Sequence, residues 1–186
     1  MIVYALCVHN LATAFAPETA VPTSRPSLVP ETTFVVRRAQ LVDVLQLAAL
    51  VNGYAAERLL LPRTTEQVAL ALDNYVVAVD AGGRVLACAA LEEYSPSVAE
   101  LSSVAVDRQF QGLGLGSQVV RATEQVARLR GFVQLFAMSL AERFFASLGY
   151  AVVALEGYPE KLARYERLAA EGVRIVPKRC FAKSLT

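Results

Sequence analysis

Histidine and cysteine are scarce in this sequence of 186 residues, and their scarcity excludes several kinds of chemistry. The single histidine is His9, and the three cysteines, Cys7, Cys88 and Cys180, are odd in number and far apart. Such a set forms no disulfide framework and supplies no cluster of zinc ligands. Ser–His and Cys–His catalytic pairs also have almost no candidates. We therefore expect a protein without a metal site that keeps its cysteines reduced, as in the cytoplasm.

Long apolar runs and an excess of one charge are also missing. Hydrophobic residues make up 55% of the sequence, yet the longest apolar runs, such as Val85–Leu91, have only the length of a strand. A membrane-spanning helix needs ~20 apolar residues. The net charge is +1, whereas a surface that binds nucleic-acid phosphates usually concentrates positive charge. The composition predicts a globular protein whose main partner is neither nucleic acid nor a membrane.

Proline is distributed unevenly and divides the sequence into two parts. Residues 1–32 contain four of the eight prolines and only three charged residues. We interpret this segment as a poorly packed extension. A targeting segment is the alternative, because Met1–Ala16 ends in an Ala-x-Ala-like pattern, although no Lys or Arg precedes its apolar stretch. Residues 33–186 are expected to form one folded domain.

The folded part alternates between the periodicities of strands and helices. The predicted strands are Phe34–Arg37, Tyr75–Val79, Arg84–Leu91, Ala99–Val106, Val133–Met138 and Tyr150–Leu155. The predicted helices are Leu41–Val51, ended by Gly53, a helix opened by a capping box at Thr64–Gln67, Gly116–Arg130, and Ala141–Leu148. Arg121, Glu124 and Arg128 are expected on a solvated face of the third helix. This order predicts an α/β fold with a mixed sheet and helices packed against it.

The most informative stretch is a glycine-rich loop between a strand and a helix, Val104-Ala-Val-Asp-Arg-Gln-Phe-Gln-Gly-Leu-Gly-Leu-Gly116. Its glycines remove side chains where a ligand must approach the backbone, and the helix offers free N–H groups and the positive end of its dipole. Together these features suit a pyrophosphate, although a flexible connection is the alternative interpretation. The loop lacks the Gly-Lys-Ser/Thr of a P-loop and the Gly-x-Gly-x-x-Gly of a dinucleotide fold.

This stretch resembles the acetyl-CoA signature of the GNAT family of N-acetyltransferases, Gln/Arg-x-x-Gly-x-Gly, and 144–150 resembles the family's Phe-Tyr-x-x-x-Gly-Phe segment. The resemblance covers about residues 33–155. It implies a mostly antiparallel sheet that splays at the acetyl-CoA site, and acetyl-CoA as co-substrate. By the same resemblance, the coenzyme contacts are Val104, Ala105, Val106, Gln111, Gly112, Leu113, Gly114, Leu115, Gly116 and Ser117.

A departure from the family pattern points to a subfamily. Many relatives carry a tyrosine that protonates the leaving thiolate, and this sequence has Phe145 in its place. N-acetylglutamate synthase, the amino-acid acetyltransferase of arginine biosynthesis, is a subfamily with a residue other than tyrosine there. Four further stretches resemble it, namely 61–67, 86–91, 99–106 and 178–185. Its long forms also carry an amino-acid-kinase domain, so we expect a short form without that domain.

The resemblance and the side-chain chemistry together suggest residues for the acceptor. Glutamate has two carboxylates, which favour arginine or lysine partners. Arg63, Ser139 and Arg179 are the candidates for binding it, and a solvated position is the alternative for each. Glu100 is the candidate base that removes the ammonium proton, directly or through water, with Glu92–Glu93 as a weaker alternative.

The expected reaction is attack by the neutral amine of a small-molecule substrate on the thioester carbonyl, with L-glutamate as the leading acceptor. One alternative is a related acetyltransferase for another small amine, another amino acid or a protein N-terminus. The other is a catalytically silent module that binds acetyl-CoA. Homodimers are common in the family, so a homodimer is a further option, although no residue in the sequence locates an interface.

Overall fold

A computed structural model describes residues 33–186, so the predictions made for residues 1–32, including Cys7 and His9, lie outside the described residues. The strands are β1 (Phe34–Arg38), β2 (Tyr75–Asp80), β3 (Val85–Glu93), β4 (Val98–Val106), β5 (Gln134–Ser139), β6 (Ala151–Val153) and β7 (Arg179–Ser184). They form one sheet of seven strands in the order β1-β2-β3-β4-β5-β7-β6. Neighbours are antiparallel except β4 and β5, which confirms the expected mixed, mostly antiparallel sheet.

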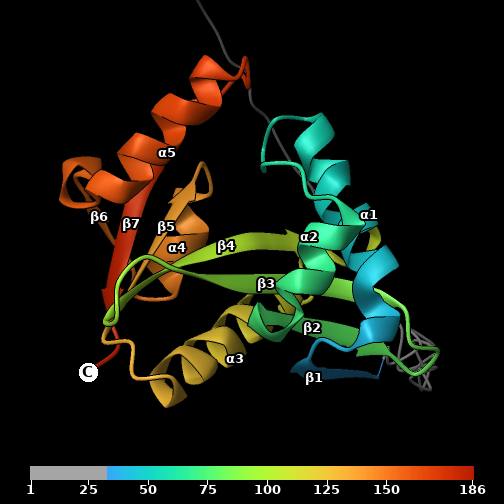
Figure 1. The fold of residues 1–186 in the computed structure, drawn as a ribbon. Helices are drawn as coiled ribbons and strands as arrows, with labels where there is room; N and C mark the ends of the chain where they lie inside the picture. The colour runs from blue at the N-terminus through green and yellow to red at the C-terminus, as the bar shows by residue number, and fades with distance from the viewer. Residues whose placement is uncertain (1–32) are drawn as a thin grey trace, which may run out of the picture. The chain divides into compact units, whose positions relative to one another are not determined.

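Helices cover both faces of this sheet (Figure 1). They are α1 (Val44–Ala56), α2 (Thr65–Leu70), α3 (Leu115–Leu129), α4 (Glu142–Ser147) and α5 (Pro159–Ala170), with 3-10 turns η1 (Leu41–Asp43), η2 (Leu72–Asn74), η3 (Arg108–Phe110) and η4 (Leu155–Gly157). The alternation of side chains along β2 explains the layers. Val76 and Ala78 pack with α3, whereas Val77 and Val79 pack with α1 and α2. Each face of the sheet therefore has its own apolar core.

The parallel strands β4 and β5 pair over only a short stretch, from Val98↔Gln134 to Glu100↔Phe136. Both strands continue beyond this ladder, β4 to Val106 and β5 to Ser139. Beyond the end of the β4–β5 ladder, β4 carries a bulge at Ser103, whose φ is 51°. The register between β3 and β4 shifts at this bulge. A bulge bends its strand away from regular pairing. The two strands therefore diverge, which confirms the splayed sheet expected from the family resemblance.

Hydrogen bonds fix two local structures, and the first of them confirms the predicted capping box. The capping box at the start of α2 is reciprocal, because Gln67 N donates to the Thr64 hydroxyl at 3.2 Å and Thr64 N donates to Gln67 Oε1 at 3.0 Å. In the β2–β3 turn, Asp80 Oδ1 accepts from Gly82 N and from Arg84 N, each at 2.9 Å. The cap fixes the start of α2 and so the position of Arg63, the residue just before it, which lies at the site described below.

The part of the chain after residue 155 was not predicted correctly. It forms η4, helix α5 and strand β7, and β7 inserts between β5 and β6. Pro159 occupies the first turn of α5, where its missing N–H costs nothing. In β7 the consecutive residues Cys180–Ala182 are all buried, which is typical of a strand covered on both faces. The expected break at Gly53 is also wrong, because α1 continues through it to Ala56.

The expectation of a fully solvated face on α3 is wrong for Glu124, which is 4% exposed. Lys183 Nζ of β7 donates to both of its carboxylate oxygens, at 2.8 and 2.9 Å, and also to the carbonyl of Leu148 at 2.8 Å. Arg128 Nε donates to the carbonyl of Leu185 at 3.0 Å. The error follows from the missed strand, since Lys183 of β7 and Leu185 just after it supply the partners of α3.

Candidate active site

A cavity of about 390 Å³ lies where β4 and β5 diverge. Its floor is the bulged part of β4, residues 100–104, and one wall is the end of β5 with residues 138–141. The opposite wall is formed by Leu59–Leu61 and Arg63, between α1 and α2. Lys161 and Tyr165 of α5 line a further side, together with Lys178. Segments distant in sequence thus surround the exposed edge of β4.

The glycine-rich loop lies at the end of β4 and leads into α3. Gly112 and Gly114 both have φ of +80°, a conformation that disfavours any residue with a side chain. A Cβ on Gly116 would meet Val106 Cγ2 at 3.3 Å and the Phe144 ring at 3.4 Å. Within residues 33–186, no side-chain hydrogen bond caps the N-terminus of α3. The first N–H groups of this long helix are therefore free for a ligand, and the geometry fits a pyrophosphate.

The predicted coenzyme residues of β4 occupy different environments. Val104 lines the cavity, whereas Ala105 is buried in the core under α1. The carbonyl of Val106 accepts a hydrogen bond from the Tyr54 hydroxyl at 2.5 Å, and that hydroxyl accepts one from Gln111 Nε2 at 2.6 Å. Tyr54, which sequence reasoning missed, therefore links the end of β4 to the glycine loop.

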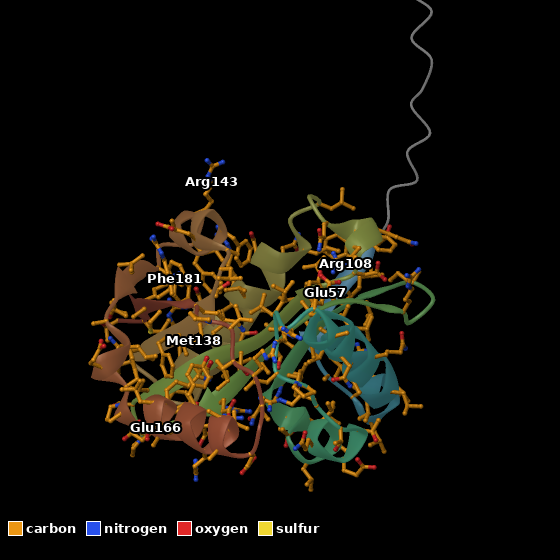
Figure 2. All side chains as sticks on the ribbon, turned by 90° about the horizontal axis from the view of Figure 1, so that it is seen from above. Glu57, Arg108, Met138, Arg143, Glu166 and Phe181 are labelled. Atoms are coloured by element: carbon orange, nitrogen blue, oxygen red, sulfur yellow. The ribbon has the colours of Figure 1, made fainter. Side chains whose placement is uncertain are left out.

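The remaining predicted loop residues divide between surface and core. Leu113 is 57% exposed at the loop, whereas Leu115 is buried beneath the start of α3, where Ser117 is partly buried in the first turn. Beside this loop, Arg108 forms an ion pair with Glu57 of the α1 C-terminus, and Figure 2 shows the two residues next to each other. The Arg108 guanidinium also stacks over the Tyr54 ring at 5.1 Å. These contacts fix the loop against α1.

Glu100, the predicted base, is buried at the bottom of the cavity and is 4% exposed. Lys161 Nζ donates to both of its carboxylate oxygens, at 2.8 and 2.7 Å, and the Tyr94 hydroxyl donates to Oε2 at 3.1 Å. Burial, followed by the negative charge of Glu100, raises the pKa of Tyr94 and of Tyr165. Both hydroxyls therefore stay protonated. Residues 102–104 all line the cavity, because the bulge at Ser103 interrupts the alternation of side chains along β4.

Arg63 lies on the cavity wall in an ordered position. Asn52 holds its backbone from α1, because Arg63 N donates to Asn52 Oδ1 at 2.9 Å and Asn52 Nδ2 donates to the Arg63 carbonyl at 2.8 Å. The Arg63 guanidinium pairs with Glu92 at 3.3 Å, and Arg164 of α5 pairs with the same carboxylate. Glu93, the neighbouring alternative base, is 61% exposed and pairs with Arg130 instead.

The other two predicted acceptor residues differ in position. Ser139 lines the cavity, and its hydroxyl accepts a hydrogen bond from Ala141 N at 3.0 Å. Arg179 lies outside the lining, because its side chain is 60% exposed and pairs with Glu142 at 2.7 Å. Lys178 lines the cavity instead, and its Nζ donates to the Leu59 carbonyl at 2.6 Å. The cavity thus contains Lys178 and not its neighbour Arg179, because successive side chains of an extended segment point in opposite directions.

The residues that sequence reasoning missed come mainly from α5 and the segment after it. Lys161, Arg164 and Tyr165 are spaced so that they share one face of a helix. That spacing, together with Pro159 at the start of the helix, could have predicted α5 and its inward-facing residues from the sequence. The opposite face carries residues that point outward, such as Glu166. Figure 2 shows Glu166 at the lower edge of the folded part of the chain, whereas Met138 of β5 lies further inside it.

Positive charge exceeds negative charge at this cavity. Arg63, Lys161 and Lys178 line it, and Arg164 contacts its carboxylate Glu92, whereas Glu92 and Glu100 are its acidic residues. Three cations and two carboxylates line the cavity, which leaves a surplus of one positive charge, and Arg164 beside Glu92 raises the surplus to two. Burial lowers the pKa of Lys178, and burial followed by the charge of Arg63 lowers that of Arg164. Within residues 33–186, no group of His, Cys, Asp and Glu side chains could hold a metal ion.

The glycine loop, the divergent strands and the order of elements recur in known proteins. Residues 42–150 match the Acetyltransferase (GNAT) family. The chain belongs to this family. It is 33% identical to an uncharacterised N-acetyltransferase of Chlorobaculum tepidum over 129 residues, which cover 69% of this chain and 83% of that one. It is 34% identical to an amino-acid acetyltransferase of Mycobacterium tuberculosis over 127 residues, which cover 67% and 71% of the two chains.

Solved structures of GNAT proteins have the same fold. A Mycobacterium tuberculosis protein crystallised with CoA has a TM-score of 0.72 and 26% identity, covering 82% of this chain and 99% of that one. The N-acetylglutamate synthase of Neisseria gonorrhoeae, complexed with coenzyme A and N-acetyl-glutamate, also has a TM-score of 0.72, with 24% identity. That match covers 84% of this chain but 36% of the synthase, and it bears on the fold alone.

The GNAT assignment makes acetyl-CoA the co-substrate, and the residues present fit it. The two αL glycines and the uncapped N-terminus of α3 have a geometry that fits a pyrophosphate, and the divergence of β4 and β5 leaves the edge of β4 unpaired, as a thioester arm would require. The cavity adjoins that edge, on the side where an acceptor amine must arrive. In the described part of the chain, none of the helices has the length and apolar character needed to cross a bilayer.

Proposed function

We propose that this GNAT protein acetylates the α-amino group of L-glutamate, the first step of arginine biosynthesis, and that it acts in the cytoplasm. The observation that carries the proposal is the surplus of positive charge in a cavity next to the open edge of β4. The name of the Mycobacterium tuberculosis relative, an amino-acid acetyltransferase at 34% identity, supports an amino acid as the acceptor.

The charge of the cavity matches the reactive form of the acceptor. Glutamate with a neutral amine carries two negative charges, which equals the surplus of two positive charges at the cavity. Cations near an ammonium group also disfavour its protonated form, so the same surplus promotes loss of the amine proton. The same positive charge therefore binds the carboxylates of the acceptor and favours the neutral form of its amine.

We assign carboxylate binding to Arg63 and Lys178, with Ser139 as a further hydrogen-bonding group. Arg63 offers a planar fork that suits a carboxylate, and its backbone is already fixed by Asn52. Lys178 is half-buried and has only a backbone carbonyl as its hydrogen-bond partner among the described residues. A half-buried cation with so few partners favours an anionic ligand.

Acetyl-CoA supplies a thioester whose carbonyl carbon accepts the lone pair of the amine. Backbone N–H groups on the unpaired part of β4, around Val104, stabilise the negative charge that develops on the carbonyl oxygen. The C–N bond forms, the C–S bond breaks, and the protons lost by the amine pass to the leaving sulfur and to solvent. Because Lys161 and Tyr94 already bind the Glu100 carboxylate, we assign Glu100 the transfer of a proton through water rather than direct abstraction.

Release of free CoA thiol in the presence of different acceptors tests this proposal. L-glutamate should give the largest kcat/KM in a panel that also contains L-aspartate, L-glutamine and a polyamine. Turnover without preference for glutamate would remove the acceptor assignment and leave the N-acetyltransferase activity intact.

Phe145 gives a second candidate, a catalytically silent module that binds acetyl-CoA. This residue, which is 3% exposed and touches the cavity, stands where many GNAT enzymes have the tyrosine that protonates the thiolate. Tight binding of acetyl-CoA without thiol release on any acceptor would select that function.

A further inference from the structure

Glu92 forms an ionic cluster in the cavity that shares no ion pair with Glu100 and Lys161 and is linked to them through Tyr94, whose hydroxyl accepts from Arg164 at 3.5 Å and donates to Glu100 at 3.1 Å. Glu92 Oε2 pairs with Arg63 at 3.3 Å, and its Oε1 forms a close ion pair with Arg164. The two arginines come from different elements, Arg63 from the segment between α1 and α2 and Arg164 from α5. Glu92, which lines the cavity, therefore joins one guanidinium group of the lining to one that lies behind it.

The two arginines lie close enough to repel each other. The charge of Arg63 is among the causes that lower the pKa of Arg164, next to burial. Neither side chain is free to move far into water, because they are 19% and 22% exposed. Two partly buried cations need an anion between them, and Glu92 supplies it. An acceptor carboxylate that enters the cavity meets Arg63, which lines it, whereas Arg164 lies behind Glu92.

We propose that Glu92 stands in for the acceptor carboxylate: it holds Arg63 and Arg164 together in the free enzyme and competes with the acceptor for Arg63. It thereby sets the affinity of the cavity for dicarboxylates. This inference rests on the proposed function, since it takes the acceptor to be a dicarboxylic amino acid. Arg63 has five N–H donors, of which Glu92 uses part, so an entering carboxylate can share the guanidinium or displace Glu92 from it.

Replacing Glu92 with glutamine tests the competition, because the amide keeps the shape of the side chain and removes its charge. Glu93→Gln is the matched control, since the next residue is 61% exposed and pairs with Arg130 at 3.7 Å outside the cavity. Binding of glutarate, a dicarboxylate without an amine, is measured by isothermal titration calorimetry in the presence of CoA, which excludes turnover. We expect Glu92→Gln to lower the Kd of glutarate about tenfold, and Glu93→Gln to leave it unchanged.

L-glutamate should gain affinity in the same way, and L-glutamine, with one carboxylate fewer, should gain less. Unchanged or weaker glutarate binding in Glu92→Gln, with an unchanged Tm, would show that Glu92 only ties α5 to the opposite wall and would overturn the proposal. Loss of affinity for L-glutamate would also overturn it, because Glu92 would then bind the amino group.

The acceptor assignment fails in a different measurement. Thiol release that does not prefer glutamate removes that assignment, whereas a tenfold gain in glutarate affinity still supports the competition by Glu92. If glutarate binds neither the wild type nor Glu92→Gln, the cavity has no carboxylate subsite and the competition is wrong.

Discussion

The coenzyme half and the acceptor half of the site are built in different ways. The coenzyme half is a continuous stretch, from Val104 to Ser117, and it works through backbone N–H groups, αL glycines and a helix terminus. The acceptor half collects side chains from β3, β4, α5, the segment before α2 and the segment before β7. A backbone site needs a local conformation, whereas a side-chain site needs the whole tertiary fold.

This difference explains why the two halves tolerate change differently. Any residue with suitable backbone geometry can present an N–H group, so the coenzyme half depends on a few glycines. In the acceptor half, each charged residue is paired or bound to a carbonyl, so removing one group leaves a partner unsatisfied. Substitutions in one half should therefore leave ligand binding by the other half intact.

Lys161→Met should have the largest effect on stability. It leaves the Glu100 carboxylate buried without its cation, and breaking a buried ion pair on one side costs about 3–5 kcal/mol. Thermal and urea denaturation measure the loss. The double variant Glu100→Gln/Lys161→Met removes both charges and should recover most of it. If the double variant is as unstable as Lys161→Met alone, packing by the lysine, not its charge, is the cause.

Gly116→Val should break the coenzyme half alone. A Cβ there meets the side chains of Val106 and Phe144 at 3.3–3.4 Å, so the larger valine side chain should push the first turn of α3 away from β4 and α4. We expect CoA affinity, measured by calorimetry, to fall on the order of a hundredfold, the range for misplaced positioning groups. Glutarate binding should change little.

Gly131→Ala, at a φ of +86° at the end of α3, is the control for backbone strain outside the site. An equal loss of glutarate affinity in Gly116→Val would refute the independence of the two halves.

The same contrast decides what could be predicted from the sequence. The glycine loop was predicted because its residues are consecutive and their physical role is local. The splayed sheet followed from the family resemblance and not from periodicity. Lys161, Arg164 and Lys178 were missed because no helix or strand was predicted after residue 155, although Pro159 indicates the start of α5 and the apolar run Cys180–Ala182 indicates β7. Glu124 was misplaced for the same reason, since its partner Lys183 lies on β7.

Pairing between charges could not be predicted from the sequence at all. Glu100 was chosen for its place on the central strand, but its partner Lys161 is 61 residues away. Arg63 was chosen as a carboxylate ligand, but nothing local indicates that it shares Glu92 with Arg164. Such pairs depend on which elements the fold brings together, and this information is not local.

Arg63→Ala should weaken the acceptor half and leave the coenzyme half unchanged. A lost charge-assisted hydrogen bond costs about 1.5–3 kcal/mol, so the KM for glutamate should rise about 10- to 100-fold. The KM for acetyl-CoA should stay within about twofold, the range for a site that makes no contact. Arg179→Ala is the matched control, because its exposed pair with Glu142 contributes little. A larger effect from Arg179→Ala than from Arg63→Ala would reverse the assignment of the two arginines.

Lys178 should give the acceptor half a pH dependence that the coenzyme half lacks. Burial lowers the pKa of Lys178, so its ammonium group loses its proton at a lower pH than that of a free lysine. Glutarate is the suitable probe, since its carboxylates stay ionised throughout and it has no amine of its own. Glutarate affinity should fall as the pH rises through the lowered pKa, by about tenfold for one lost charge contact.

Lys178→Arg should bind glutarate with little change over the same range, because arginine stays protonated. Lys178→Met should bind weakly at every pH. CoA affinity depends on backbone N–H groups. It should therefore not show this alkaline loss in the wild type or in either variant. A glutarate profile that is the same in wild type and Lys178→Arg would assign the alkaline loss to another group.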